Sequence, residues 1–317
     1  MTGPLRGAAV VLPGESGALP GMVDAWLTDP QARDVVAEVS EVVGRDVAEW
    51  WREPANAPDP VATHLEVVVT GVAGYRSLTA SGLDPVVVAG HGVGEYAALV
   101  AAGALELAQV VELVHWRSEL LALAPRPSCA GMSAVVGPGA GAVARAAVER
   151  VGGTLAVASC DAPGQVVLSG SCEDLAGAAA VVHRAGLDLV RLPGRAPCHG
   201  PLMAPVAAHL AAALGDLDWS VPAVPVLPNG DPRPTRDPDV LAAELRHHLT
   251  SAVQWESTSR ALVDAGATSV VEVGAVPVLG PLISQVHPDL PVSLASGPGT
   301  PIPTDTSQLA LAGTVPS

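Results

Sequence analysis

Short apolar runs alternate with longer helical segments along the first third of this 317-residue chain. Ala8–Leu12 and Val86–Ala89 are apolar at consecutive positions, which predicts strands that are buried on both faces. Between them, Val61–Ala80 predicts a long apolar helix, and a helical stretch around Asp34–Trp51 precedes it. The order strand, helix, strand with these lengths predicts a parallel sheet with right-handed crossovers, which is the α/β class.

The pattern changes after residue 127 and indicates a second, smaller unit. Its apolar runs and helical stretches follow the order βαββαβ, which is typical of a ferredoxin-like fold. Ser171 and Asp174 form a capping-box pattern that predicts where the second helix of this unit begins. The predicted elements are Met132–Val136, Gly141–Val151, Leu155–Ser159, Gln165–Ser169, a helix from Ser171 to about Ala185, and Leu187–Leu192.

The last third of the chain returns to the alternation of helices and buried strands. Helices are predicted at Pro201–Leu214, Asp237–Leu249 and Trp255–Ala265, and strands at Ala223–Leu227 and Ser269–Val273. From Pro291 onward Pro, Ser, Thr and Gly dominate without periodicity, which predicts a disordered tail over residues 291–317.

Composition and charge narrow the classes of function. All 16 basic residues are Arg, so lysine chemistry such as a Schiff base is excluded. The net charge of −16 argues against nucleic-acid and membrane partners, and it would also repel acidic carrier proteins. Uninterrupted apolar runs are too short for a membrane span. The four Cys show no metal-type spacing, and we expect reduced thiols, no metal site and a cytoplasmic location.

The most informative segment is Ala89-Gly90-His91-Gly92-Val93-Gly94-Glu95, which joins a predicted strand to a helix beginning near Tyr96. A sharp glycine-rich turn at this place is where a nucleophile elbow holds a serine. The segment resembles the malonyl-CoA:acyl-carrier-protein acyltransferase family, including polyketide synthase acyltransferase domains. That family has Gly-His-Ser-x-Gly-Glu, so Gly92 takes the place of the serine. The resemblance covers about residues 8–287.

The resemblance implies a fold and a division of the chain. An α/β-hydrolase-like large domain would comprise residues 1–127 and 199–290. A ferredoxin-like subdomain of residues 128–198 would be inserted into it, and residues 291–317 would follow as the tail.

The resemblance also assigns roles to particular residues. His199, in Pro197-Cys198-His199-Gly200, matches the catalytic base, although a polar histidine at a strand–helix junction is the alternative. Arg117 lies on an apolar helical stripe with Val114 and Leu121, where the family's arginine pairs with the malonyl carboxylate. A salt bridge to an internal carboxylate is the alternative for Arg117.

Other site residues follow from the same comparison. Backbone N–H groups of Val93 and Glu15 would form the oxyanion hole, and the Glu15 carboxylate departs from the family pattern there. His91, Cys198 and His248 are further candidates for contacting the substrate, with a helix-surface histidine as the alternative for His248.

Three functions stay open at this point. The first is acyl transfer in fatty-acid or polyketide biosynthesis, made doubtful by the absent serine. The second is a catalytically silent protein that binds a carrier protein or a ketosynthase and influences starter-unit choice. The third is a thioesterase in which His199 activates water. No cofactor is expected, because a thioester of CoA or phosphopantetheine is the substrate. The expected partners are acyl-CoA, an acyl carrier protein and a ketosynthase.

Overall fold

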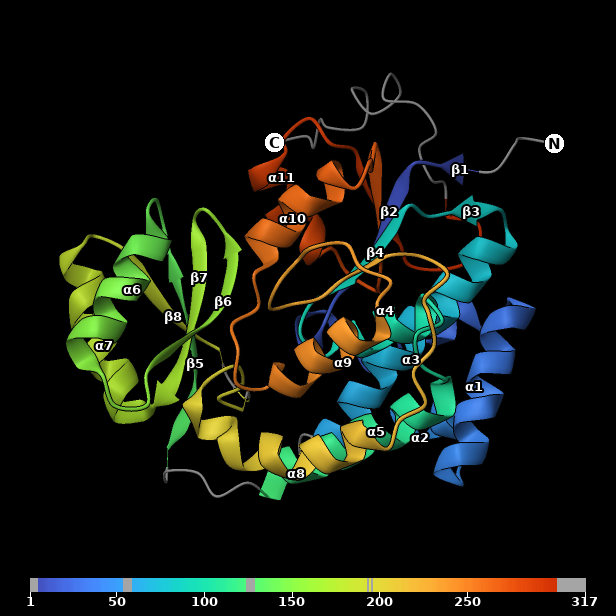
Figure 1. The fold of residues 1–317 in the computed structure, drawn as a ribbon, viewed down its shortest axis with the longest axis horizontal. Coiled ribbons are helices and arrows are strands. Elements are labelled where there is room, and N and C mark those ends of the chain that lie inside the picture. The colour runs from blue at the N-terminus through green and yellow to red at the C-terminus, as the bar shows by residue number, and fades with distance from the viewer. Residues whose placement is uncertain (1–4, 54–58, 124–128, 193, 195, 301–317) are drawn as a thin grey trace.

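A computed structural model describes residues 5–53, 59–123, 129–192, 194 and 196–300. A parallel five-stranded sheet with helices on both faces forms the large domain, and a smaller α/β unit lies beside it (Figure 1). The strand order is β11-β10-β2-β4-β9. Its strands are β2 (Ala8–Leu12), β4 (Val87–Gly90), β9 (Val226–Leu227), β10 (Ser269–Val273) and β11 (Val292–Ala295). A separate pair of short parallel strands, β1 (Leu5–Arg6) and β3 (Leu83–Asp84), precedes β2 and β4 in the chain.

The central strand β2 shows why the sheet is covered on both faces. Successive side chains of a strand point to opposite faces, so Val10 and Leu12 join one apolar core while Ala9 and Val11 join the other. The helices of the first face are α1 (Pro30–Val43), α2 (Val47–Arg52), α3 (Pro60–Ala80), α4 (Gly94–Ala101), α5 (Leu107–Leu123), α8 (Ala204–Gly215) and α9 (Pro238–His247). Those of the second face are α10 (Trp255–Asp264) and α11 (Leu279–Val286).

The smaller unit is an antiparallel sheet with two helices on one face. Its strand order is β6-β7-β5-β8, with β5 (Ala130–Val136), β6 (Ala156–Ala162), β7 (Gln165–Ser171) and β8 (Asp188–Leu192). Helices α6 (Ala140–Val151) and α7 (Cys172–Arg184) cover one face. The other face carries a small apolar cluster with Met132, Ala134 and Val167, which line a cavity against the large domain. The predicted fold class, a parallel sheet with a ferredoxin-like unit, is confirmed.

Two predicted elements differ from the structure for local reasons. The helical stretch Asp34–Trp51 is two helices, because Gly44 ends α1 with φ of +75° and Asp46 caps α2. The helix predicted from Pro201 begins as a 3₁₀ turn, Pro201–Met203, before α8. Ser171 caps α7 by accepting the Asp174 N–H, but the Asp174 carboxylate accepts from Thr154 and does not complete a capping box.

Two further predictions were wrong. The segment after Pro291 is not disordered throughout: Val292–Ala295 pairs with β10 as the edge strand β11, and residues 301–317 lie outside the described residues. The cysteines are not all reduced, because Cys129 and Cys172 form a disulfide, while Cys160 and Cys198 are free thiols. Their spacing of 43 residues carries no sequence signal for this pairing. Among the described residues, no helix has the length and apolar character that a membrane span requires.

Candidate active site

The turn between β4 and α4 is built from closely packed backbone. A Cβ on Gly90 would lie 2.1 Å from the Gly94 carbonyl oxygen, and one on Gly94 would lie 2.3 Å from that of Leu12. Both positions therefore require glycine. Gly92 lies between them with φ of +54°, and apart from its two chain neighbours the described residues place one atom, His199 Nε2 at 3.8 Å, within 4 Å of where its Cβ would be. The turn thus presents residue 92 to the imidazole of His199.

A buried polar network holds this turn in place. Asn229, which follows β9, accepts the Gly92 N–H at 3.0 Å and donates to the Gly90 carbonyl at 2.9 Å. Its own N–H donates to the Glu95 carboxyl at 3.1 Å. Burial raises the pKa of Glu95 to about 8, with its hydrogen bonds to Asn229 acting in the opposite direction. This shift favours the protonated, neutral form of Glu95 near pH 7.

His199 and His248 pack against each other behind the turn. His199 Nδ1–H donates to the carbonyl oxygens of His248 (2.8 Å) and Ser251 (3.2 Å), which leaves Nε2 as an acceptor facing Gly92. Burial lowers the pKa of His199 to about 4, so the ring is neutral at pH 7. His248 is buried and its Nε2–H donates to the Gly92 carbonyl at 3.0 Å. It supports the turn from behind and is not a helix-surface histidine.

Arg117 lies on α5 with only 3% of its surface exposed. Its guanidinium lies 5.7 Å from the centre of the Tyr96 ring, and Nη1 lies 3.5 Å from His64 Nδ1. Among the described residues no carboxylate comes within 4 Å of it, and its Nε has no hydrogen-bond partner. The internal salt bridge considered for Arg117 is absent from this part of the chain. A buried guanidinium in this condition is suited to bind an incoming carboxylate.

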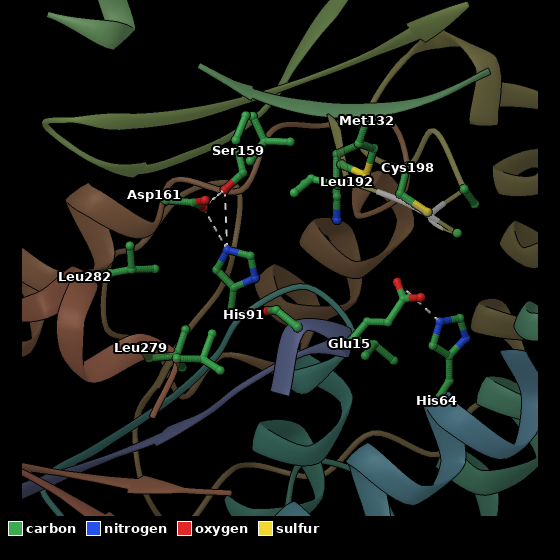
Figure 2. Close-up of a pocket in the computed structure, with 18 of the residues that line it drawn as sticks. Glu15, His64, His91, Met132, Ser159, Asp161, Leu192, Cys198, Leu279 and Leu282 are labelled. Carbon is green, nitrogen blue, oxygen red and sulfur yellow. Dashed lines mark hydrogen bonds and ion pairs between the residues drawn. The ribbon is translucent and has the colours of Figure 1, made fainter. Parts of the chain in front are cut away.

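The predicted oxyanion donors meet at the same turn. Val93 precedes α4, and no described residue accepts its N–H. The segment carrying Glu15 abuts it, because a Cβ on Gly14 would lie 3.5 Å from the Val93 nitrogen. The Glu15 carboxylate extends toward His64, with Oε2 3.9 Å from His64 Nε2 (Figure 2).

Most of the predicted site residues line one cavity of about 440 Å³ between the two domains (Figure 2). The cavity brings together Glu15, His91, Val93, Arg117, Cys198 and His199 from the predicted set, together with Gly92 beside His199. His248 does not line it. Met132 and Leu192 of the smaller unit and Leu279 and Leu282 of α11 supply its apolar walls. A polar centre between apolar walls is typical of a small-molecule site.

Sequence reasoning missed several residues of the site. Asn229 contacts the Gly92 turn and His64 contacts Arg117, while Glu95 was noted in the motif but given no role. Asp161 and Ser159 of β6 contact His91. The position of Asn229 was one available signal. It follows a predicted strand, and the carboxyl ends of parallel strands meet at the edge of the sheet where sites form. The contact between β6 and the turn depends on how two domains pack, and no local pattern encodes it.

Comparisons with known proteins agree with this geometry. The acyl transferase domain family matches residues 21–301. The malonyl CoA-acyl carrier protein transacylase of Escherichia coli (strain K12) is 31% identical over 296 residues, covering 92% of this chain and 96% of that protein. An acyl carrier protein S-malonyltransferase from Vibrio cholerae superposes with a TM-score of 0.86 at 29% identity, covering 92% and 97% of the two chains.

A second solved structure contains a partner. It is a malonyl-transacylase in complex with a type II polyketide synthase acyl-carrier protein, with a TM-score of 0.84 and 27% identity, covering 91% of this chain and 96% of that one. The extent of the family match and the identity to the transacylases settle the assignment: this chain belongs to the acyl transferase family that includes the malonyl-CoA:acyl-carrier-protein transacylases.

Proposed function

We propose that this chain binds malonyl-type thioesters of CoA or of an acyl carrier protein in fatty-acid or polyketide biosynthesis, without forming an acyl-enzyme at residue 92. Gly92 stands where the family has its nucleophilic serine, and glycine offers no atom to acylate. The proposal is carried by the buried Arg117, which lacks a carboxylate partner among the described residues and opens onto the cavity that contains His199. The carrier as partner is suggested by the transacylase solved with one.

The role of Arg117 can be tested by comparing two ligands. Arg117→Gln is expected to weaken malonyl-CoA binding roughly 10- to 100-fold, because a hydrogen-bonded charge contributes about 1.5–3 kcal/mol. Acetyl-CoA, which has no acyl carboxylate, should bind both proteins alike in isothermal titration calorimetry. Arg76→Gln, a substitution of a half-exposed arginine on α3, serves as the control. Equal losses for both ligands would contradict carboxylate recognition by Arg117.

Hydrolysis is a second candidate, favoured by the open space at Gly92. Apart from its two chain neighbours, the described residues place only His199 Nε2 within 4 Å of a Cβ there, which leaves space beside residue 92 for an attacking water. A histidine acting as general base contributes about 10²- to 10⁴-fold to such a reaction. The N–H of Val93 would bind the developing oxyanion.

Intact-mass spectrometry separates these functions. The protein is incubated with malonyl-CoA and a carrier protein, and both proteins are weighed. Loss of acyl groups from either thioester supports hydrolysis. A complex without any mass change supports a silent binding role toward the carrier or a ketosynthase. Malonyl transfer to the carrier would show that another group replaces the serine, and would refute the proposed absence of acyl transfer.

A further inference from the structure

His91 is held by a buried carboxylate from the other domain. His91 precedes Gly92 on the large domain, whereas Asp161 lies on β6 of the smaller unit, and His91 Nε2 lies 3.0 Å from Asp161 Oδ1. Strand β6 is fastened to the large domain beside this contact, where Cys160 N–H donates to the Val253 carbonyl at 2.8 Å. The pair therefore forms only when the two domains are packed together.

The Asp161 carboxylate is fully hydrogen-bonded. Gln165 donates to Oδ2 at 3.0 Å, and Ser159 donates to Oδ1, which also accepts from His91. Burial by itself would raise the pKa of Asp161, but its hydrogen bonds from His91, Ser159 and Gln165 hold it below the usual value. Asp161 is therefore an anion at neutral pH although only 5% of its surface is exposed.

This arrangement fixes which nitrogen of His91 faces the cavity. Because Nε2–H donates to Asp161, Nδ1 is the acceptor nitrogen, and it points into the cavity (Figure 2). The edge-on contact with Trp255, at 5.4 Å between ring centres, restricts rotation of the ring. His91 thus presents a lone pair beside Gly92 in a single orientation.

The two imidazoles that border Gly92 differ in what supports them. Nδ1 of His199 donates only to neutral carbonyl oxygens, and the ring lies near the positive charge of Arg117. His91 is supported by an anionic carboxylate, the arrangement that stabilises an imidazolium as it forms. We propose that His91 is the general base of a thioester hydrolysis at this site and that Asp161 is the residue that positions it. The proposal rests on the hydrolytic function above.

The reaction needs only water as co-reactant. A water O–H bond breaks, its proton passes to His91 Nδ1, and the oxygen bonds to the thioester carbonyl carbon. The tetrahedral intermediate then collapses, the C–S bond breaks, and the proton on Nδ1 passes to the departing sulfur. The products are the free carboxylic acid and the free thiol of CoA or phosphopantetheine, and His91 regains its starting state.

The test measures thiol release from malonyl-CoA by the full chain. Asp161→Asn is expected to lower kcat by about 10²- to 10⁴-fold while leaving KM unchanged. His91→Gln should lose the same factor, and the double variant no more than either single one, because the two residues act as a unit. Asp188→Asn, the same substitution at an exposed position of β8 in the same unit, is the matched control and should stay near the wild-type rate.

Several results would overturn the assignment. One is a wild-type kcat in Asp161→Asn. Another is a His199→Ala variant that loses about 10²- to 10⁴-fold in kcat while His91→Gln loses nothing. A wild-type protein that binds malonyl-CoA in calorimetry but releases no thiol would refute hydrolysis and leave the binding function standing, whereas absence of binding would refute both.

A second measurement does not depend on the variants being active. Proton NMR of the wild-type protein should show a downfield imidazole N–H signal from the His91–Asp161 bond. The signal should persist in His199→Ala and disappear in His91→Gln. A wild-type spectrum without it would contradict the pairing even if Asp161→Asn failed to fold.

Discussion

At the scale of single residues, Gly92 decides what chemistry the site can perform. Its φ of +54° is a conformation that costs a side-chain-bearing residue about 1–3 kcal/mol. The Cβ of a serine there would lie 3.8 Å from His199 Nε2, with no closer described atom apart from its chain neighbours. We therefore expect Gly92→Ser to fold, with that loss of stability, and to acylate itself weakly with malonyl-CoA, as measured by intact mass.

The same variant makes a prediction about pH. Because burial lowers the pKa of His199 to about 4, its Nε2 remains an acceptor from pH 8 down to about 5. The rate of self-acylation in Gly92→Ser should show no loss from His199 protonation over that range and should fall only as pH approaches 4. Gly92→Ala, which has the same backbone cost but no hydroxyl, is the control. A folded Gly92→Ser variant without any acylation would show that Glu15 or the cavity has also diverged.

At the scale of elements, the sequence was informative wherever structure is local. The apolar runs at Ala8–Leu12 and Ser269–Val273 coincide with β2 and β10, and the order βαββαβ was correct. Edge strand β11 was missed because a strand with one neighbour has a weaker apolar pattern, and all but one of its residues are only half-buried. Arg117 and His199, which were predicted from motifs, both line the cavity, and their roles stay predictions. Asp161 was not predicted, because its contact with His91 is made between domains.

The disulfide is another feature at this scale. Cys129, just before β5, is joined to Cys172 at the start of α7, closing a loop of 43 residues within the smaller unit. Such a crosslink restricts the unfolded chain and stabilises the fold by about 4 kcal/mol in the chain-entropy model. We expect the Cys129→Ser/Cys172→Ser variant to lose most of that amount in urea unfolding without reductant. Cys160→Ser, at a free thiol, is the control, and equal stability of the double variant and wild type would contradict the prediction.

At the scale of the whole molecule, several ionisable side chains are held neutral in the interior. Glu95 and Glu66 have pKa values raised by burial to about 8 and about 7, while burial lowers those of His199 and His248. Each difference between the folded and unfolded pKa makes stability depend on pH. Both histidines stabilise the fold above pH 6.5 and lose that contribution as the pH falls below 6.5, with the loss from His199 complete near pH 4. The glutamates stabilise the fold at low pH and lose that contribution as the pH rises toward their folded pKa values. Above pH 6.5 the contribution of the histidines is constant, so a change in stability there comes from the glutamates.

Glu95 can be isolated in that upper range. Between pH 6.5 and 8 the unfolded chain has Glu95 ionised while the folded protein keeps it protonated, so the free energy of unfolding falls as pH rises. The contribution approaches about 1 kcal/mol per pH unit. Glu95→Gln cannot ionise and should show a correspondingly flatter profile in urea unfolding, with the effect of Glu66 common to both proteins. Glu112→Gln, at an exposed position of α5, should follow the wild type. Parallel profiles for Glu95→Gln and wild type would mean that Glu95 is already charged beneath the turn, and that the site has one more anion than its hydrogen bonds indicate.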